Sequence, residues 1–274
     1  MVKEEFEREI SFPLFKGRIQ ARFDDPLFLK SISDCHQLLE DAGTEILLDR
    51  RNRVGVVKLP LRDGKSVEVV IKEFRSLGLG KLKTLFFSSK AFKSWQGATA
   101  LVRRGIETPF PVAYLEKREK GLLTQSFFLA QRLDNVQEIR FLLRKLPEEK
   151  LHLLLAAVAR FLFSCHEKGI LHRDLSDGNI LVKKDGEGFN FFLIDTNRIQ
   201  LSEKISLPKR IKNLVRLGVP PQFQKFFLKQ YLGELPAKKH VWLWYRLNKK
   251  KYSFLVEFKK KLRLRQLAQK LKIQ

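Results

Sequence analysis

This 274-residue sequence has only two cysteines and no long apolar run. The two cysteines, Cys35 and Cys165, cannot form a disulfide framework, and no histidines are spaced with them as zinc ligands. No apolar run approaches the roughly 20 residues of a membrane-spanning helix. The beginning of the chain, Lys3-Glu4-Glu5, carries too much charge for a signal peptide. Together these absences predict a cytoplasmic protein in a reducing compartment.

Internal repeats and low-complexity linkers are also absent, so the organisation follows from helical and strand signals. The length is sufficient for one large domain or for two lobes with a sizeable core. We expect a helix near Leu27–Leu39, ended by Gly43, and then a strand-rich lobe that continues to about Leu133. The most hydrophobic helix is expected over Leu151–Cys165, as a buried central helix.

Acidic residues are scarce in the last part of the chain. Residues 201–274 hold 20 Lys and Arg against 3 Asp and Glu, so this segment carries +17 of the net charge of +24. The basic charge is therefore localised. A surface of this kind can bind nucleic acid, anionic lipid headgroups or a phosphorylated sugar acid.

Apolar residues recur at helical steps within this basic segment. They are Phe254, Phe258, Leu262, Leu264, Leu267 and Leu271, with Lys259, Lys260, Lys261, Arg263 and Arg265 between them. The pattern is typical of a basic amphipathic helix at an anionic membrane surface. Aromatic residues among lysines are also found in nucleic-acid binders, although we consider nucleic acid an unlikely partner. A terminal helix that packs its apolar stripe on the protein is a third reading.

One stretch indicates a reaction. In the segment 172–179, Asp174 can accept a hydroxyl proton and Asn179, five residues on, can ligate a metal. Asp195 ends the apolar run Phe191–Ile194 and can hold Mg²⁺. These are the polar groups that phosphoryl transfer needs, in the order that kinases have them.

The spacing of these residues predicts a β-hairpin. Asn179 precedes the strand Ile180–Val182, Asp185-Gly186 marks a turn, and Phe189–Ile194 is a second strand. A hairpin of this size brings Asn179 and Asp195 to one end of the sheet, within reach of a shared Mg²⁺, which prefers oxygen ligands. Singly, these residues would be read as turn formers or strand caps.

A lysine upstream completes the set. Val67, Val69 and Ile71 alternate with Glu68, Val70 and Lys72, which predicts a short strand after the turn at Asp63-Gly64. Lys72 leaves the end of this strand, where its ammonium would contact the α- and β-phosphates of ATP.

Two features of protein kinases are missing. Between the strands expected at 46–48 and 56–58, Gly55 is the only glycine of the loop that should cover the phosphates; three arginines, at 50, 51 and 53, stand there instead. They could bind phosphate oxygens or form an exposed basic turn. The helix expected between Ser89 and Gly105 has no carboxylate to pair with Lys72.

Four segments resemble the bacterial lipopolysaccharide core kinase family, which acts on Kdo and heptose sugars and is related to protein kinases. The resemblance implies an α+β, two-lobed protein-kinase-like fold with a strand-rich N-lobe and a mainly helical C-lobe. Many members carry Glu just before the helix Trp, where this chain has Ser94. The segments are Ser89–Trp95, Arg104–Tyr114, His172–Leu181 and Leu193–Asp195.

The resemblance also implies roles for single residues. Asp174 would be the catalytic base, Asn179 and Asp195 would bind Mg²⁺, and Lys72 would bind the phosphates of ATP. Gln131-Arg132-Leu133 reads as the connection between the lobes, where the backbone of Arg132 and Leu133 would bind adenine. The expected division is an N-terminal extension 1–45, an N-lobe 46–133, and a C-lobe 134–274 with catalytic loop 172–179 and basic segment 201–274.

We therefore expect an ATP- and Mg²⁺-dependent kinase that phosphorylates a Kdo or heptose hydroxyl of the lipopolysaccharide inner core or of its lipid-linked precursor. It would act as a peripheral protein on the cytoplasmic face of the inner membrane. Two alternatives stay open: an atypical protein or small-molecule kinase, and a catalytically dead pseudokinase that binds acidic lipid or RNA. Thr196-Asn197 in place of Phe-Gly, and Ser176 where protein kinases often have Lys, make a protein substrate less expected.

Overall fold

The computed structural model describes residues 7–75, 82–85, 87–233 and 239–270, with the side chains of 82, 83, 239 and 263–270 left out. Lys3, Glu4 and Glu5, on which the signal-peptide argument rests, lie outside the described residues. The chain forms two compact units, each discontinuous in sequence. Unit 1 comprises Met1–Val136 and Phe192–Ile199, and unit 2 comprises Gln137–Phe191 and Gln200–Gln274.

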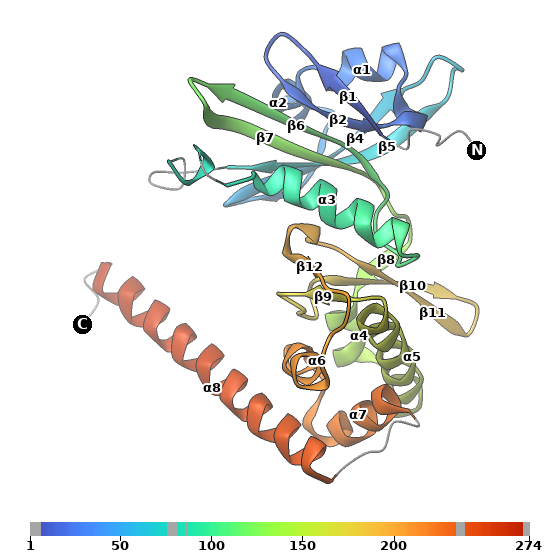
Figure 1. The fold of residues 1–274 in the computed structure, drawn as a ribbon, viewed down its shortest axis with the longest axis vertical. Helices are drawn as coiled ribbons and strands as arrows, with labels where there is room; N and C mark the ends of the chain where they lie inside the picture. The colour runs from blue at the N-terminus through green and yellow to red at the C-terminus, as the bar shows by residue number, and fades with distance from the viewer. Residues whose placement is uncertain (1–6, 76–81, 86, 234–238, 271–274) are drawn as a thin grey trace. The chain divides into compact units, whose positions relative to one another are not determined.

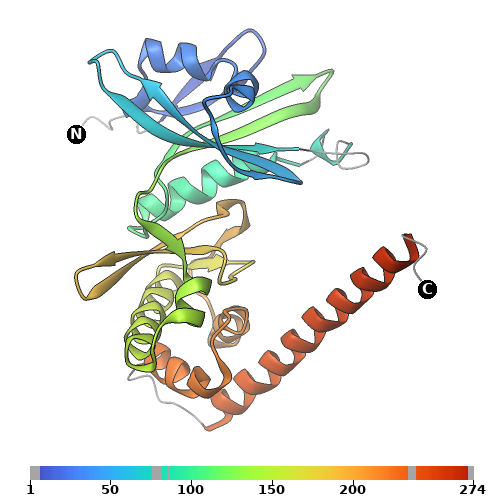
Figure 2. The same cartoon turned by 180° about the vertical axis from the view of Figure 1, so that it is seen from behind.

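Unit 1 is built on a seven-stranded sheet in the order β1-β2-β6-β7-β5-β4-β3. All of its recorded strand pairs are antiparallel. Helix α3 (Lys90–Arg103) lies on one face of the sheet, and α1 (Pro26–Ile32) and α2 (Cys35–Glu40) lie on the other (Figure 1; Figure 2). The strands are β1 Glu7–Ser11, β2 Lys16–Gln20, β3 Glu45–Asp49, β4 Asn52–Pro60, β5 Ser66–Phe74, β6 Pro111–Glu119 and β7 Leu122–Gln131; a 3₁₀ turn, η1, spans Ala21–Phe23 and another, η3, spans Leu82–Leu85.

The alternation in β5 separates two faces of the sheet, as the sequence predicted. Val69 and Ile71 are fully buried in a core shared with Phe28 and Ile32 of α1. Successive side chains of a strand point to opposite faces, so Lys72 lies on the face that carries α3. Lys72 pairs with Val54 of β4 on one side and Phe128 of β7 on the other. A central strand therefore holds the lysine.

The chain before β3 departs from the predicted organisation. Instead of one helix over Leu27–Leu39 there are two short ones, because Asp34 leaves the helical conformation and its side chain accepts a hydrogen bond from the Gln37 amide, which starts α2. The predicted continuous helix was wrong at this point. The residues assigned to an N-terminal extension supply β1, β2, α1 and α2 to the sheet and core of unit 1.

Helix α3 begins and ends where the sequence indicates. The Ser89 hydroxyl accepts a hydrogen bond from the Phe92 amide and caps the first turn. Gly105 follows the helix with φ of +60°, a conformation that favours glycine. The buried face of the helix is formed by Ala91, Trp95, Ala98 and Leu101.

Unit 2 is mainly helical. Its central helix is α5 (Glu148–Glu167), in which Leu154, Leu155, Val158 and Leu162 are almost fully buried, as the sequence predicted for the helix over Leu151–Cys165. The other elements are α4 Ile139–Lys145, β9 Ile170–His172, β10 Ile180–Asp185, α6 Leu207–Leu214, η5 Pro221–Phe223, α7 Gln224–Leu232 and α8 Lys239–Lys270.

Three strands each contain a point at which the chain passes from one unit to the other. They are β8 (Val136–Glu138), β11 (Gly188–Leu193) and β12 (Ile199–Leu201), and η4 (Thr196–Arg198) stands between the last two. Strands β10 and β11 are neighbours in a three-stranded sheet with β8, so the predicted hairpin is present. The α+β class, with one strand-rich part and one mainly helical part, is confirmed.

The two cysteines are buried free thiols. Burial raises the pKa of the Cys165 thiol to about 12, so this group is a packing residue rather than a reactive one. In the part of the chain that is described, no helix has both the length and the apolarity that crossing a bilayer requires.

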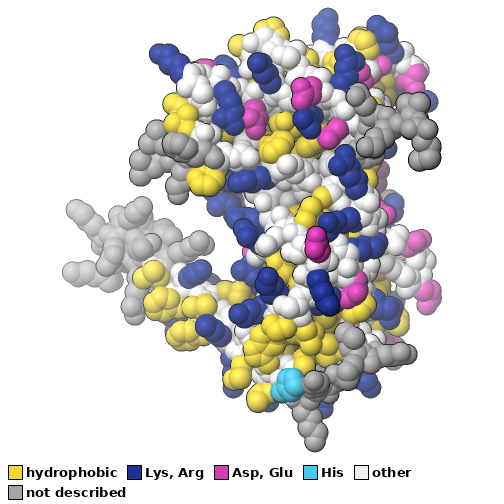
Figure 3. Space-filling model, viewed as in Figure 1, with side chains coloured by type: hydrophobic (Ala, Val, Ile, Leu, Met, Phe, Trp, Pro, Cys, Tyr) yellow, Lys and Arg dark blue, Asp and Glu magenta, His cyan; other side chains and the backbone are white. Residues whose placement is uncertain are grey.

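Helix α8 changes its environment along its length. Val241 and Tyr245 are buried in unit 2. From Ser253 to Leu262 every residue is exposed, and Phe254 and Phe258 retain 66% and 56% of their accessible surface. Figure 3 shows apolar and basic side chains intermixed along this segment. The apolar stripe therefore does not pack on the described residues; the side chains of Arg263, Leu264, Arg265, Leu267 and Leu271 lie outside the description.

Candidate active site

In unit 1 the two predicted site residues Lys72 and Asp195 contact each other. The Lys72 ammonium donates a hydrogen bond to Oδ1 of Asp195. The two side chains are 23% and 31% exposed, respectively. The residues are 123 positions apart in the sequence. Helix α3 has no carboxylate that could neutralise the charge of Lys72, and Asp195 supplies this negative charge instead.

Asp195 has a left-handed backbone, with φ of 59° and ψ of 44°. Only Lys120 and Asn135 share a positive φ among the described residues that are not glycine. Such a conformation costs about 1–3 kcal/mol and persists where the surroundings enforce it, often at functional sites.

The strand before Asp195 is held by the segment after α3. The Leu193 amide donates to the Glu107 carbonyl at 3.0 Å, and the Thr108 hydroxyl donates to the Leu193 carbonyl at 2.7 Å. Thr108 is buried, so its hydroxyl requires a partner. The segment 105–113, which carries much of the family resemblance, thus serves to position the strand that leads to Asp195.

The residue after Asp195 is held by α3 itself. The Thr196 hydroxyl donates to the Ser94 carbonyl at 2.8 Å, and both residues are buried. A Cβ atom on Gly97 would lie 2.1 Å from the Thr196 carbonyl oxygen, so only glycine permits this approach. Helix α3 is therefore connected to the Asp195 segment through the Thr196 hydroxyl, the Ser94 carbonyl and the close approach at Gly97.

Cations surround this carboxylate. Partial burial lowers the pKa of the Lys90 ammonium, and the neighbouring charges of Arg51, Arg198 and Lys72 lower it further, while Asp195 opposes the shift. Positive charge therefore exceeds negative charge here. A region of this kind favours a bound anion such as a phosphate chain.

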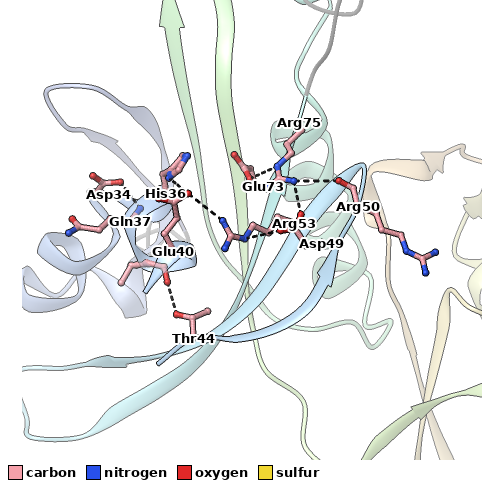
Figure 4. A network of polar contacts seen from close by, with 11 residues as sticks. Asp34, His36, Gln37, Glu40, Thr44, Asp49, Arg50, Arg53, Glu73 and Arg75 are labelled. Carbon is pink, nitrogen blue, oxygen red and sulfur yellow. Dashed lines mark hydrogen bonds and ion pairs between the residues drawn. The ribbon is translucent and has the colours of Figure 1, made fainter. Parts of the chain in front are cut away.

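The loop of three arginines is smaller than the sequence indicated. The turn between β3 and β4 consists of residues 50 and 51 only, and Arg53 lies within β4. Arg53 is directed to Asp49 and Glu40, both at 3.6 Å. In Figure 4 the Arg50 guanidinium points away from this network. Of the three, Arg50 and Arg51 form an exposed basic turn, whereas the Arg53 side chain pairs with Glu40 and Asp49.

Gly55 has a packing role. A Cβ atom there would lie 2.7 Å from Cδ2 of Leu39 and 2.9 Å from Cγ2 of Thr44. The glycine thus lets α2 approach the sheet, and it is not part of a loop over phosphates. The one glycine that the sequence offered for this loop therefore lies within β4.

The connection after β7 offers fewer backbone groups than expected. The Arg132 amide donates to the Glu68 carbonyl at 2.9 Å, and its guanidinium pairs with Glu45 at 3.0 Å. Leu133 follows outside any strand and is partly buried. An adenine base that binds here would have to form hydrogen bonds with backbone groups other than the Arg132 N–H.

In unit 2 the catalytic loop is a compact turn after β9. The side-chain nitrogen Nδ2 of Asn179 donates to the Asp174 carbonyl at 2.7 Å and closes the turn. Leu175 is buried as an anchor, and Asp174 keeps half of its side-chain surface exposed. A Cβ atom on Gly178 would lie 1.5 Å from Nη2 of Arg140, so a larger residue there would displace the end of the Arg140 side chain.

Behind this loop lies a buried chain of polar side chains. Asn213 donates through Nδ2 to the His172 carbonyl at 2.7 Å, and its Oδ1 is 3.0 Å from Nε2 of His166. The acceptor Oδ1 assigns the proton of His166 to Nε2, so Nδ1 accepts from the Tyr231 hydroxyl at 2.7 Å. The Asp174 amide donates to Nδ1 of His172 at 3.2 Å. The network orients the loop that carries Asp174.

Sequence reasoning missed these supporting residues, and it also missed Arg216. The guanidinium of Arg216 donates to Oδ1 of Asp174 at 2.9 Å. Arg216 follows α6, and His166, Asn213 and Tyr231 come from α5, α6 and α7. No spacing in the sequence connects them, because each comes from a different helix or loop.

Comparison with known proteins gives one family and one fold. Residues 68–223, more than half of the chain, match the model of the lipopolysaccharide kinase (Kdo/WaaP) family. No curated protein sequence matches significantly. A solved structure described as WaaP in complex with acyl carrier protein is similar, with a TM-score of 0.57 and 20% identity, over 83% of this chain and 97% of that one.

The close approach at Gly97 leads to a test of the α3 contact. Gly→Ala in a helix normally stabilises by roughly 0.5–1 kcal/mol, but here the methyl group would displace the Thr196 backbone. We expect Gly97→Ala to lower the unfolding free energy by about 1–3 kcal/mol, as overpacking does. Urea denaturation measures this, with Gln96→Ala on the exposed side of α3 as the matched control. Stabilisation by Gly97→Ala would contradict the contact.

The buried network predicts a dependence of stability on pH. Burial lowers the pKa of His166 from 6.5 to about 4. Between these values the unfolded chain binds a proton that the folded one does not, so the unfolding free energy falls as pH falls from 6.5 to 4, by about 3 kcal/mol for this group. We expect His166→Gln, whose amide can both accept and donate, to flatten this slope in denaturation measured across that range.

The matched control for this measurement is His152→Gln on the same helix. His152 lies at the surface of α5, where its Nδ1 contacts the Glu148 carbonyl at 3.0 Å. This variant should keep the full acid slope of the wild type. An equal slope in wild type and His166→Gln would mean that other groups cause the loss of stability.

Proposed function

The chain belongs to the lipopolysaccharide kinase (Kdo/WaaP) family and is a kinase, and on that premise we propose that it transfers a phosphoryl group from Mg-ATP to a hydroxyl of a Kdo or heptose sugar in the lipopolysaccharide inner core. The observation that carries the proposal is the contact between Lys72 and Asp195, with the aspartate fixed in a left-handed conformation. A lysine and a metal-binding aspartate are shared parts of kinase phosphate sites.

We assign the roles as follows. Lys72 binds the nucleotide phosphates, supported by the excess of positive charge around Lys90. Asp174 accepts the proton of the sugar hydroxyl, supported by its half-exposed carboxylate in an otherwise anchored loop. Backbone groups at Arg132 and Leu133 bind the adenine; for Arg132 this leaves the carbonyl, since its amide is used within the sheet.

Asp195 and Asn179 are the proposed ligands of Mg²⁺. Their donor chemistry fits the ion, because it prefers oxygen ligands and is usually held by one or two carboxylates with waters and phosphates. The side-chain nitrogen of Asn179 donates to the Asp174 carbonyl, so the side-chain oxygen of Asn179 points away from that carbonyl. Among the described residues no cluster of three or more His, Cys, Asp or Glu side chains could hold a metal. When bound, the ion would neutralise phosphate charge.

The first test separates base, metal and nucleotide roles. We expect Asp174→Asn to reduce phosphate transfer by about 10²–10⁴-fold, as the loss of a general base does, with nucleotide affinity nearly unchanged. Asp195→Asn should instead reduce Mg²⁺-dependent nucleotide affinity, because it removes a charged ligand. Transfer of radiolabelled phosphate to Kdo- and heptose-containing lipopolysaccharide, together with nucleotide titrations, measures both effects.

Asp185→Asn is the matched control, since Asp185 lies at the exposed turn of the β10–β11 hairpin and accepts from Asn190. Full transfer by Asp174→Asn would overturn the assigned base. Nucleotide binding by the wild type without transfer to any hydroxyl would favour the alternative of a pseudokinase. Transfer to proteins or small alcohols in preference to lipopolysaccharide would favour an atypical kinase.

For the location we propose the cytoplasmic face of the inner membrane, with α8 as the contact to anionic lipid and with lipopolysaccharide or its lipid-linked precursor as partner. The support is the exposure of Phe254, Phe258 and Leu262 beside Lys259, Lys260 and Lys261. Each Lys or Arg near an anionic surface contributes about 1 kcal/mol. The similar WaaP structure is a complex with acyl carrier protein, so that protein is the alternative partner to examine.

Deleting residues 254–274 should abolish sedimentation with anionic vesicles and spare nucleotide binding. A full-length variant with Lys259, Lys260 and Lys261 changed to Gln should bind these vesicles more weakly, and added salt should weaken wild-type binding, since the Debye length falls from about 10 Å at 0.1 M to about 3 Å at 1 M. Neutral vesicles are the control. Indifference to anionic vesicles, with tight binding of RNA or of acyl carrier protein, would contradict the membrane assignment.

A further inference from the structure

The loop that follows α6 brings a cation to the proposed catalytic base. Within residues 172–179 the only arginine is Arg173, which is exposed and donates to Gln200 at 3.1 Å. The charge beside Asp174 comes instead from Arg216, 42 residues further along the chain, at 2.9 Å. Under the proposed function, the acceptor hydroxyl must approach the carboxylate of Asp174. The Arg216 guanidinium binds the same carboxylate.

The backbone on both sides of Arg216 is fixed. Val215 and Leu217 are buried, so the side chain between them is directed outward. Lys249 of α8 donates from its ammonium to the Val215 carbonyl at 2.8 Å and to the Leu217 carbonyl at 2.7 Å. Burial lowers the pKa of Lys249 to about 8, so unfavourable desolvation of this lysine accompanies the contact.

The same loop also packs on the catalytic loop. A Cβ atom on Gly218 would lie 2.7 Å from Oδ2 of Asp177, so the backbone at Gly218 lies close to this side chain of the catalytic loop. The Arg216 guanidinium lies 5.7 Å from the ring centre of Tyr252, on α8. The first half of α8 and the catalytic loop therefore hold Arg216 from two sides, in one geometry relative to Asp174.

The guanidinium has donors beyond those that the contact with Asp174 uses. One nitrogen, Nη1, makes that contact, whereas the group carries five N–H donors in a rigid planar fork. The Arg216 side chain is 35% exposed, next to the 50% exposed Asp174. A second anionic group can thus reach it from solvent. Arginine forks match carboxylate and phosphate oxygens in two-point hydrogen bonds.

We propose that Arg216 is an acceptor-binding residue, which binds an acidic group of the sugar substrate close to the hydroxyl that Asp174 deprotonates. The proposal rests on the proposed function. The acidic group is a carboxylate or a phosphate of the acceptor, and both offer paired anionic oxygens. Through Lys249 and Tyr252 the first half of α8 becomes part of the acceptor site.

The test compares variants and acceptors in one matrix. Wild type, Arg216→Gln and Arg216→Lys are assayed with ATP and three probes: a Kdo-containing lipopolysaccharide acceptor, its carboxyl methyl ester, and the same acceptor with its phosphates removed. Arg246→Gln, an exposed arginine of α8, is the matched control. Thermal unfolding of each variant establishes that it is folded.

We expect Arg216→Gln to raise the acceptor KM by about 10- to 100-fold, as the loss of a charge-assisted hydrogen bond does, with the ATP KM unchanged. Arg216→Lys should restore part of the affinity. Wild type should lose affinity for one of the two neutralised acceptors, which identifies the carboxylate or the phosphate as the bound group. Arg216→Gln should not discriminate between that acceptor and the parent.

Equal affinity of wild type for all three acceptors would overturn the proposal, and this arm does not depend on the folding of any variant. A fall in kcat alone for Arg216→Gln, with the acceptor discrimination of the wild type kept, would mean that Arg216 only positions Asp174. A rise in the ATP KM to the same extent as the acceptor KM would also contradict it. Absence of transfer by the wild type to every acceptor would instead refute the proposed function.

Discussion

The contact between Lys72 and Asp195 is the interaction on which the candidate site of unit 1 depends. A lysine on a central strand needs a counter-charge when it is mostly buried, and α3 carries no carboxylate that could provide one. Asp195 provides it with a left-handed backbone, a conformation that costs about 1–3 kcal/mol. The surroundings therefore have to hold the short segment from Leu193 to Thr196 on both sides.

The contacts that hold the Asp195 segment come from α3 and from the residues directly after it. Thr108 and Glu107, just after α3, hold Leu193, and Ser94 and Gly97 within α3 hold Thr196. In two of these contacts a threonine hydroxyl, of Thr108 or Thr196, donates to a backbone carbonyl, and Gly97 permits the close approach. These contacts hold the Asp195 segment beside Lys72 although α3 has Ser94 and no carboxylate.

Unit 2 follows the same principle with side chains instead of backbone. Tyr231, His166 and Asn213 form a buried chain of hydrogen bonds that leads to the His172 carbonyl. Such a network is rigid only when it is fully satisfied. It ends at the His172 carbonyl, and Arg216 with its Lys249 support approaches Asp174 from another side, so the half-exposed aspartate stands on a loop that is fixed from several directions.

The sequence by itself indicated the strands from β3 to β7, the β10–β11 hairpin and the central helix. It also singled out Lys72, Asp174, Asn179 and Asp195, whose roles stay predictions. Period-two alternation, turn residues and motif spacing are local, and local patterns can be read along a chain. It also overextended two features: one helix over Leu27–Leu39, which Asp34 divides, and an arginine loop from which Arg53 and Gly55 are withdrawn into the sheet.

Only the tertiary structure decided which residues support the site. Arg216 lies 42 residues from Asp174, Tyr231 lies 65 from His166, and Thr196 lies 102 from Ser94. No local period connects positions so far apart, and Arg, Tyr, Thr and Ser are common at surfaces for many reasons. Their roles arise because packing of the core buries polar atoms, and a buried polar atom has to find its partner wherever the fold brings one.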